Sequence, residues 1–403
     1  MHPITEILEE LRAGRMIVLV DDEQRENEGD LVCAAEYVTP QIINFMLREG
    51  RGMMCVPLAA EICDALELEP QTRINTTQRA TAFTVSVDAH ERFGVTTGVS
   101  ASDRATTIRV LIDAESQPVD LARPGHIQPL RARVGGSLVR AGQTEGSVDL
   151  CRLAGLHHGA VLIEIMNEDG TMARRGDLEH LCHRHQLKMC SVADVIQYRL
   201  QREKLIERIE EIPFENTCGC FRLIAYVSQV DPMPHVALVS GDLGCLDTKG
   251  EPIEITDPVL VRMHSQNLLG DVFGDLTQPS GDTLQNAMRM IQLAGRGAVV
   301  YLRHEGMGRG LLKRLQTASV PDADPSDGGD ALRLGSSQES PGIRPPMRTA
   351  DYGIGSQILR DLGARKLRLI TNHPFTPTAL SGFDLSIVEF VPVAASDPVI
   401  LPR

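Results

Sequence analysis

The sequence predicts a protein of the α+β class that is built from two domains. The chain has 403 residues, which is roughly two to three times the length of a typical domain. Hydrophobic residues make up 42% of it and charged residues 23%, so most of the chain has the composition of an ordinary globular core and surface. Short apolar runs typical of buried strands alternate with amphipathic helical patterns, which indicates layers of sheet and helix.

In the first half, the apolar spacing within ITEILEELRAG predicts a helix over residues 4–13 that Gly14 ends. Thr39 and Pro40 are the cap and first-turn residues of a second predicted helix, which Gly50 closes. Ser102 is the expected N-cap of a later one. Further helices are predicted near 102–113, 144–154 and 177–186, and strands at 16–20, 31–35, 53–56, 83–87 and 161–165.

The stretch VADVIQYRLQREKLIERIEEI, from Val192, is predicted to form one long helix that ends at Pro213. Its middle is rich in charge, as expected where a connection crosses solvent. We therefore place a domain boundary near residue 205, giving domains 1–205 and 206–403. Strands are predicted at 221–227, 236–239, 259–263 and 298–302, and helices at 282–294 and 353–362. Residues 320–346 are dense in Pro, Asp, Ser and Gly, which predicts a mobile loop or a disordered insert.

Charge and composition exclude several classes of partner. A net charge of −14 argues against nucleic acid and anionic membranes as partners, because phosphate binding needs a positive field. Aromatic residues are 3% and Trp is absent, so surfaces that stack bases are not expected. The acidic, amphipathic N-terminus is unlike a secretory leader, and no apolar run approaches the roughly 20 residues of a membrane span. Nine irregularly spaced cysteines indicate reduced thiols, and we predict a cytoplasmic protein.

A run of acidic residues, DDEQRENEGD at 21–30, lies between two predicted strands. It holds six carboxylates and one arginine, Arg25. A solvated turn and a carboxylate site for a hard cation such as Mg²⁺ both fit this pattern, and crowding at a sheet edge favours a cation or a proton. An EF-hand is excluded, because Gly29 at loop position 6 would put Gln24 and Ala35 at the two terminal ligand positions.

Four other segments carry candidate site residues. The hydroxyl-rich run TTGVSASDR, 96–104, fits either a phosphate site at a helix start or a plain capped helix. His126 follows a turn, Arg140 and Thr144 flank another helix start, and Glu164 lies inside an apolar strand, where a carboxylate pairs, binds metal or has a raised pKa. Two thiol patterns, CGC at 218–220 and CHRH at 182–185, are interpreted as a strand edge and a helix surface and not as metal sites.

Taken together, the segments of the first half resemble the 3,4-dihydroxy-2-butanone 4-phosphate synthase family. The matching stretches cover nearly all of residues 1–200 in order: VDDEQRENEGDLV, NTTQRATAFTVSVDA, TTGVSASDRATTI, RPGHIQPLRARVGG, RAGQTEGSVDLCRLAG and AVLIEIMNEDGTMAR. The resemblance implies an α/β sandwich, usually a homodimer with its site near the subunit interface. It also implies the conversion of D-ribulose 5-phosphate to 3,4-dihydroxy-2-butanone 4-phosphate and formate through a metal-stabilised enediolate.

The resemblance also implies roles for individual residues. It makes Glu26 a ligand of Mg²⁺ or Mn²⁺ and makes His126 and Glu164 catalytic. The residues that contact the sugar phosphate are implied to be Arg25, Glu26, Asp30, Arg140 and Thr144.

Two departures from the family's pattern lie near this implied site. Gln143 stands where the family has a histidine that binds the metal, so Gln143 is the second metal-ligand candidate. An amide oxygen suits Mg²⁺ but is a weaker donor, and we expect metal affinity to fall by at least about 10–100-fold. Arg79 and Ala80 replace an aromatic or histidine residue followed by glycine.

The second half resembles GTP cyclohydrolase II, so the whole chain resembles the bifunctional riboflavin biosynthesis proteins. The matching stretches are HVALVSGD, VRMHSQNLLGDVFGDL, GAVVYLRHEGMGRGLLK, DYGIGSQILRDLGARKLRLITNHP and GFDLSIVEFVPV. Positions that the family uses for zinc-binding cysteines, catalytic Asp and Arg, and a lysine are here Asn267, Gln278, Ser280, Arg348, Ala350 and Thr376. Because zinc needs thiolate or imidazole ligands, we expect no zinc and no GTP cyclohydrolase II activity in this half.

Two hypotheses about function follow. In the first, the first half is an active carbon–carbon lyase and the second a non-catalytic scaffold. In the second, the whole chain is a pseudoenzyme that binds a ligand or regulates active riboflavin enzymes. We favour the lyase, because one substitution by another oxygen ligand is less damaging than the loss of six positions.

Overall fold

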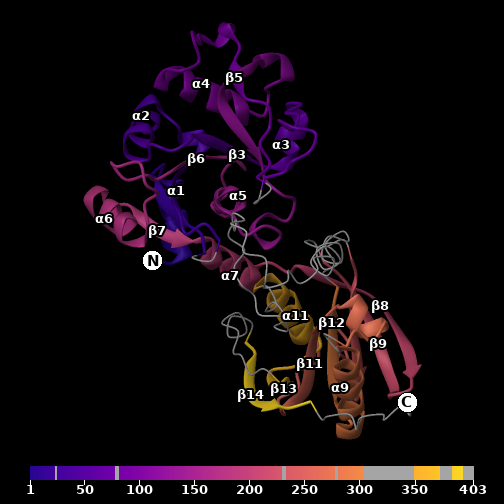
Figure 1. Ribbon diagram of the computed structural model, residues 1–403. Helices are drawn as coiled ribbons and strands as arrows, with labels where there is room; N and C mark the ends of the chain where they lie inside the picture. The colour runs from indigo at the N-terminus through magenta and orange to yellow at the C-terminus, as the bar shows by residue number, and fades with distance from the viewer. Residues whose placement is uncertain are drawn as a thin grey trace, which may run out of the picture. The chain divides into compact units, whose positions relative to one another are not determined.

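The computed structural model describes residues 1–22, 25–77, 81–228, 233–276, 280–303, 349–372 and 384–393. The chain divides into two compact units, Met1–Arg199 and Leu200–Arg403 (Figure 1). The predicted insert at 320–346, the Arg79–Ala80 pair, Gln278, Arg348 and Thr376 lie outside the described residues. In the described part of the chain, no helix is long and apolar enough to cross a membrane.

The first unit is a seven-stranded mixed sheet with strand order β4-β5-β3-β6-β2-β1-β7. Its strands are β1 (Ile17–Val20), β2 (Gly29–Ala34), β3 (Cys55–Leu58), β4 (Val87–Ala89), β5 (Leu121–Arg131), β6 (Ala160–Glu164) and β7 (Lys188–Ser191). Its helices are α1 (Ile4–Arg12), α2 (Pro40–Glu49), α3 (Ala60–Ala65), α4 (Ala101–Ile112), α5 (Gln143–Leu153), α6 (Arg175–His185) and α7 (Val192–Arg202).

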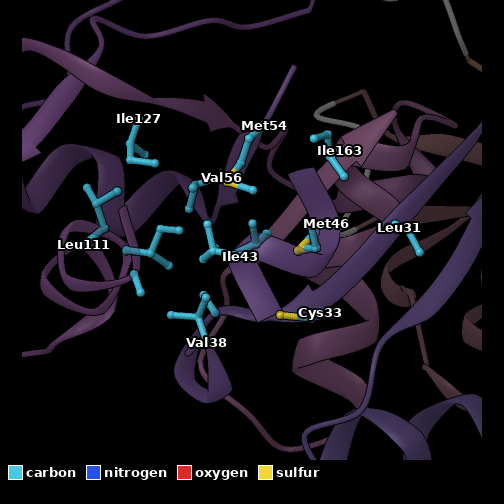
Figure 2. Close-up of a cluster of buried hydrophobic side chains, with 14 of the residues drawn as sticks. Leu31, Cys33, Val38, Ile43, Met46, Met54, Val56, Leu111, Ile127 and Ile163 are labelled. Atoms are coloured by element: carbon cyan, nitrogen blue, oxygen red, sulfur yellow. The ribbon is translucent and has the colours of Figure 1, made fainter. Parts of the chain in front are cut away.

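Helices cover both faces of this sheet, which confirms the predicted sandwich. Every residue of β1 and β2 is buried, as expected of strands packed on two sides. On one face, Val18 and Leu31 join a core that includes Ile43 and Met46 of α2 and Leu111 of α4, part of which is seen in Figure 2. On the other face, α5 approaches so closely that a side chain added at its Gly146 would touch Leu19 of β1.

The second unit contains another seven-stranded sheet, with strand order β14-β13-β11-β12-β10-β9-β8. Its strands are β8 (Ile206–Asn216), β9 (Gly219–Ser228), β10 (His235–Ser240), β11 (Val259–Ser265), β12 (Gly297–Leu302), β13 (Lys366–Ile370) and β14 (Ser386–Val391). The described helices are α8 (Leu268–Val272), α9 (Ser280–Ala294) and α11 (Thr349–Asp361). Ala287 and Ile291 of α9 pack on Val299 and Leu260 of the sheet.

Three local predictions are wrong. The strand predicted at 83–87 does not form as such: Phe83 and Thr84 make only isolated bridges, and β4 begins at Val87. The predicted long helix stops at Arg202, and residues 206–216 form β8, which pairs along its whole length with β9 in an antiparallel hairpin. The ladder hydrogen bonds of this hairpin outweigh the helical preference of the Glu- and Arg-rich segment. Ser100, not Ser102, caps α4: its backbone is extended and its Oγ accepts a hydrogen bond from the Asp103 N–H at 3.0 Å.

Candidate active site

The acidic turn between β1 and β2 is organised around Arg25. Its Nη1 donates to Asp21 Oδ2, Glu26 Oε2 and Gln143 Oε1, each at 2.8 Å. Asp21 is buried and also accepts hydrogen bonds from the Glu26 and Glu28 N–H groups, at 3.0 and 2.9 Å. The described residues of the turn, 21–22 and 25–30, are therefore held by their own hydrogen bonds and do not form the freely solvated loop that is usual for a run of charges.

The start of α5 brings two further predicted residues to the same place. Gly142 is the N-cap of α5, so the first N–H groups of the helix open beside Gln143 and Thr144. A Cβ added at Gly142 would lie 2.6 Å from Arg140 Nη1 and 3.1 Å from Arg25 Nη2. Two guanidinium groups and a helix N-terminus thus converge, an arrangement that suits a phosphate.

Asp30 and Glu164 face each other across the β2–β6 pair. Asp30 is buried, and its Oδ1 has no hydrogen-bond partner in the described structure. Burial raises the pKa of Asp30 well above its ordinary value, and the neighbouring Glu164, Glu26, Asp21 and Glu28 carboxylates raise it further. A buried carboxyl group beside other carboxylates holds its proton more tightly than a free one, which is typical of functional sites.

His126 lies on β5 and lines a pocket of about 410 Å³ together with Gly52, Met53 and Arg104. Its side chain is 48% exposed, and its Nδ1 lies 2.7 Å from Asp88 Oδ2. Glu164 approaches the same pocket, because its Oε2 accepts a hydrogen bond from the Met53 N–H at 2.7 Å. The imidazole thus lines the cavity and the carboxylate is bonded to one of its lining residues; both are usual groups of acid–base catalysis.

The predicted residues accordingly form two neighbouring groups. Arg25, Glu26, Arg140, Gln143 and Thr144 meet at the acidic turn and the start of α5. Asp30 and Glu164 connect this group to the pocket that His126 lines. Within the described part of the chain, no hydrogen bond or ion pair joins His126 directly to Arg25 or Glu26.

The loop 96–104 behaves as a capped helix start. Thr96 Oγ1 donates to Asp103 at 2.8 Å, so this hydroxyl completes the loop's own hydrogen bonds. Arg104 Nε donates to Val99 O at 2.8 Å, while its side chain borders the pocket. The capped-helix interpretation of this segment therefore accounts for the hydroxyls of Thr96 and Ser100.

The oxygen atoms around Arg25 have the chemistry of a magnesium site. Glu26 Oε2 and Gln143 Oε1 face one another across the same guanidinium nitrogen, so positive charge already lies between them. Among the described residues, no three His, Cys, Asp or Glu side chains are grouped to hold a metal. Magnesium nevertheless often takes only one or two protein carboxylates and completes its shell with water and substrate oxygens, so this donor pair fits a hard divalent cation.

The corresponding region of the second unit does not fit zinc. Asn267 caps α8 and Ser280 begins α9; both are buried, and Asn267 Nδ2 donates to Ser280 Oγ at 3.0 Å. The resemblance to GTP cyclohydrolase II implies that these are two of the three positions at which that family has cysteines. Neutral amide and hydroxyl groups that bond each other replace the thiolates that zinc requires.

Sequence reasoning missed the group at the centre of this cluster, Asp271. It accepts hydrogen bonds from Ser280 Oγ, from the Asn267 N–H at 2.9 Å and from Tyr301 OH at 2.8 Å, and it pairs with His264 at 3.0 Å. Burial raises the pKa of Asp271, but His264, Ser280 and the Asn267 N–H together outweigh burial and hold this pKa at about 2. No predicted element or motif singled it out, because α8 itself was not predicted and the partners of Asp271 come from other segments.

Comparisons with known families and proteins cover the whole chain. Residues 5–198 match the family model of 3,4-dihydroxy-2-butanone 4-phosphate synthase, and residues 207–392 match that of GTP cyclohydrolase II. The riboflavin biosynthesis protein RibBA of Aquifex aeolicus (strain VF5) is 45% identical over 393 residues, which are 97% of this chain and 92% of that protein. The RibBA protein of Bacillus subtilis (strain 168) is 46% identical over 97% of this chain and 93% of its own length.

A solved structure is similar over both units. It is the crystal structure of RibBX, a two-domain 3,4-dihydroxy-2-butanone 4-phosphate synthase from A. baumannii, and it matches with a TM-score of 0.74 at 34% sequence identity. The match covers 98% of this chain and 100% of that one. Both predicted folds, and their order in the chain, agree with these findings.

Proposed function

This chain belongs to the RibBA family of riboflavin biosynthesis proteins, in which a 3,4-dihydroxy-2-butanone 4-phosphate synthase domain precedes a GTP cyclohydrolase II domain. On that premise, we propose that its first domain converts D-ribulose 5-phosphate to 3,4-dihydroxy-2-butanone 4-phosphate and formate. We propose further that its second domain is not catalytic. The similar A. baumannii protein has two domains and is named only for the synthase activity, which supports both parts.

The observation that carries the synthase proposal is that Glu164, which pairs with Asp30 across β2 and β6, is bonded to Met53, a residue of the pocket that His126 lines. The proposed reaction needs protons to be removed from and returned to carbon and oxygen atoms of one small sugar. Carboxyl groups and an imidazole that reach one bound sugar can do this without moving far.

Each group then has a proposed task. Arg140, Arg25 and the start of α5 bind the phosphate end of the sugar, and Thr144 supplies a hydroxyl there. Glu164, which the Met53 N–H holds in place, and His126 move protons at the reacting carbons. Asp30, whose raised pKa favours its protonated form, donates a hydrogen bond to a substrate oxygen.

Glu26 and Gln143 would hold the divalent cation, Mg²⁺ or Mn²⁺. When bound, the cation supplies positive charge where oxygen atoms of the reacting sugar become negative. Because Arg25 Nη1 lies between the two oxygens, we expect the guanidinium to shift toward the phosphate when the ion enters. We expect the cation to bind more weakly with the neutral Gln143 amide as a ligand than it would with a histidine.

The hydrogen-bonded cluster of Asp271, Asn267 and Ser280 is the basis for the proposal about the second domain. Asn267 and Ser280 are already each other's hydrogen-bond partners and offer zinc no thiolate. We therefore propose that this domain does not convert GTP.

One experiment tests both parts. The full chain and its Gln143→His variant are incubated with ribulose 5-phosphate and Mg²⁺, and formate is measured; a parallel sample receives GTP, Mg²⁺ and Zn²⁺. We expect formate from both proteins, with about 10–100-fold tighter apparent Mg²⁺ binding in the variant. If neither folded protein releases formate, the pseudoenzyme hypothesis replaces the lyase. A diaminopyrimidine product from GTP would refute the proposal about the second domain.

We also propose that the protein is a cytoplasmic homodimer that binds a small sugar phosphate and neither nucleic acid nor membrane. The pocket at the half-exposed His126 leaves room for a second copy of the chain to complete the site. Light scattering coupled to gel filtration measures the mass in solution, and a monomer that is fully active would contradict the dimer.

A further inference from the structure

We propose that Asp88 is a positioning residue, which holds the His126 imidazole with its proton on Nδ1 and leaves Nε2 available to the pocket. Asp88 Oδ2 lies 2.7 Å from His126 Nδ1, and Asp88 Oδ1 accepts a hydrogen bond from the His126 N–H at 2.9 Å. One carboxylate therefore fixes both the ring and the backbone of the histidine. This inference rests on the synthase function proposed for the pocket.

The pairing of β4 with β5 explains how the two residues meet. Val87 pairs with Ile127, but the next residue, Asp88, pairs with Ala122. Residues 123–126 are therefore extra residues on the β5 side of the ladder, and they loop out of it. This bulge places His126 directly beside the Asp88 side chain, although the two residues lie 38 positions apart in the chain.

Close backbone packing keeps the pair in this geometry. A Cβ added at Gly98 would lie 2.1 Å from Asp88 Oδ2 and 2.6 Å from His126 Nδ1, so only glycine allows the loop to pass here. Gly98 also has a φ of +81°, which favours glycine. The Gly98 N–H is tied in turn to Asp103 Oδ2 at 3.2 Å. The carboxylate and the imidazole thus have little freedom to separate.

The contact between Asp88 and His126 determines which nitrogen of the imidazole can act as a base. A neutral imidazole can accept a proton only on the nitrogen that lacks one, and the hydrogen bond at the other nitrogen decides which tautomer is present. A carboxylate at Nδ1 selects the form in which Nε2 is the base, and it stabilises the imidazolium that forms when that base takes a proton. Arg104, the other charged side chain on this pocket, offers only donors and cannot perform that role.

A purely structural ion pair between β4 and β5 is the competing explanation. The two explanations differ in what the Asp88→Asn variant changes. An asparagine amide can donate to Nδ1 and so reverse the tautomer while it keeps the size and polarity of the side chain. If Asp88 only joins the two strands, Asp88→Asn affects stability and leaves the tautomer of His126 as it was.

The test measures kinetics and tautomer on the full chain. Formate release from ribulose 5-phosphate with saturating Mg²⁺ gives kcat and KM for the wild type, Asp88→Asn, Asp88→Ala and Asp88→Glu. ¹⁵N NMR on chain labelled at histidine gives the tautomer of His126, whose signals are assigned from their loss in His126→Gln. We expect Asp88→Asn to lower kcat by about 100-fold with KM nearly unchanged, and to move the proton from Nδ1 to Nε2. Asp88→Glu should recover part of kcat.

Asp64→Asn is the matched control. Asp64 also binds a residue of β5, Arg131 at 2.6 Å, but at the end of the strand and outside the pocket. The Asp64→Asn variant should leave kcat and the tautomer of His126 unchanged.

The proposal is overturned if Asp88→Asn keeps the Nδ1–H tautomer, whatever happens to its melting temperature, or if it keeps wild-type kcat. The proposed function fails separately if the wild type releases no formate. The NMR arm would still decide whether Asp88 sets the tautomer, because that measurement needs no turnover.

Discussion

Two buried aspartates, one in each domain, have opposite environments. Asp30 in the first domain lies among four other carboxylates, has an oxygen without a hydrogen-bond partner in the described structure, and has a raised pKa. Asp271 in the second has a partner for each oxygen and a pKa of about 2. A buried carboxyl group without a hydrogen-bond partner is tolerated where a ligand is to be bound. A carboxyl group that only stabilises the structure has hydrogen-bond partners within the protein. The contrast suggests that the first domain retains a working site.

The largest expected effect is on catalysis in the first domain. We expect Glu164→Gln to lower the rate of formate release by about 10²–10⁴-fold, because the amide can still accept from the Met53 N–H but cannot transfer a proton. Glu168→Gln, a change at an exposed carboxylate four residues later, is the control. Near wild-type turnover by Glu164→Gln would show that the Glu164 carboxylate, like that of Asp271, only stabilises the structure.

The next effect in size is on the stability of the second domain. Asp271→Asn leaves His264 beside a neutral group in a buried cluster, and losing one partner of a buried pair costs about 3–5 kcal/mol. We expect the second domain to unfold at lower temperature in calorimetry, while formate release at 25 °C is unchanged. Asp242→Asn, which breaks an exposed pair with Arg296, should have little effect. Equal melting of the two variants would contradict a structural role for Asp271.

The smallest expected effect is on the pH dependence of stability. The pKa of Asp271 is about 2 in the folded chain, below the roughly 3.9 of an unfolded aspartate. Its contribution, on the order of 2 kcal/mol, is fully present above about pH 4 and is lost as pH falls toward 2. The pKa of Asp30 affects the pH dependence of stability in the opposite direction. Because this pKa is raised, the folded state binds the proton more tightly than the unfolded state, and stability is lost as the pH rises. The stability difference between wild type and Asp271→Asn should shrink between pH 5 and pH 2; a constant difference would contradict the lowered pKa.

Local signals in the sequence predicted the first domain well. Thr39 accepts the predicted hydrogen bond, from the Ile42 N–H, and Pro40 begins α2. The apolar spacing of the first residues became α1, with Ile7 and Leu11 fully buried. The site residues came from the resemblance to a family, because no local pattern shows that Arg25 and Gln143, 118 residues apart, share a hydrogen bond.

Failures occurred where pairing between distant segments decides the outcome. The segment after Arg202 has a helical composition. It nevertheless forms β8, because its backbone pairs with β9 in an antiparallel ladder. Asp88 was not singled out, because its significance depends on a bulge in the β4–β5 ladder. Asn267 and Ser280 were identified as lost zinc ligands, but the sequence contains no sign that they bond each other.

The sequence alone was sufficient for the two-domain α+β architecture and the family. Those properties depend on residue type, periodicity and motif order, which are local. Only the tertiary structure decided which carboxyl oxygen lacks a partner in the described residues, that Asp88 lies against His126, and that Asn267 and Ser280 bond each other. Those properties depend on burial and on hydrogen bonds between residues far apart in the chain, and both exist only after the sheets have formed.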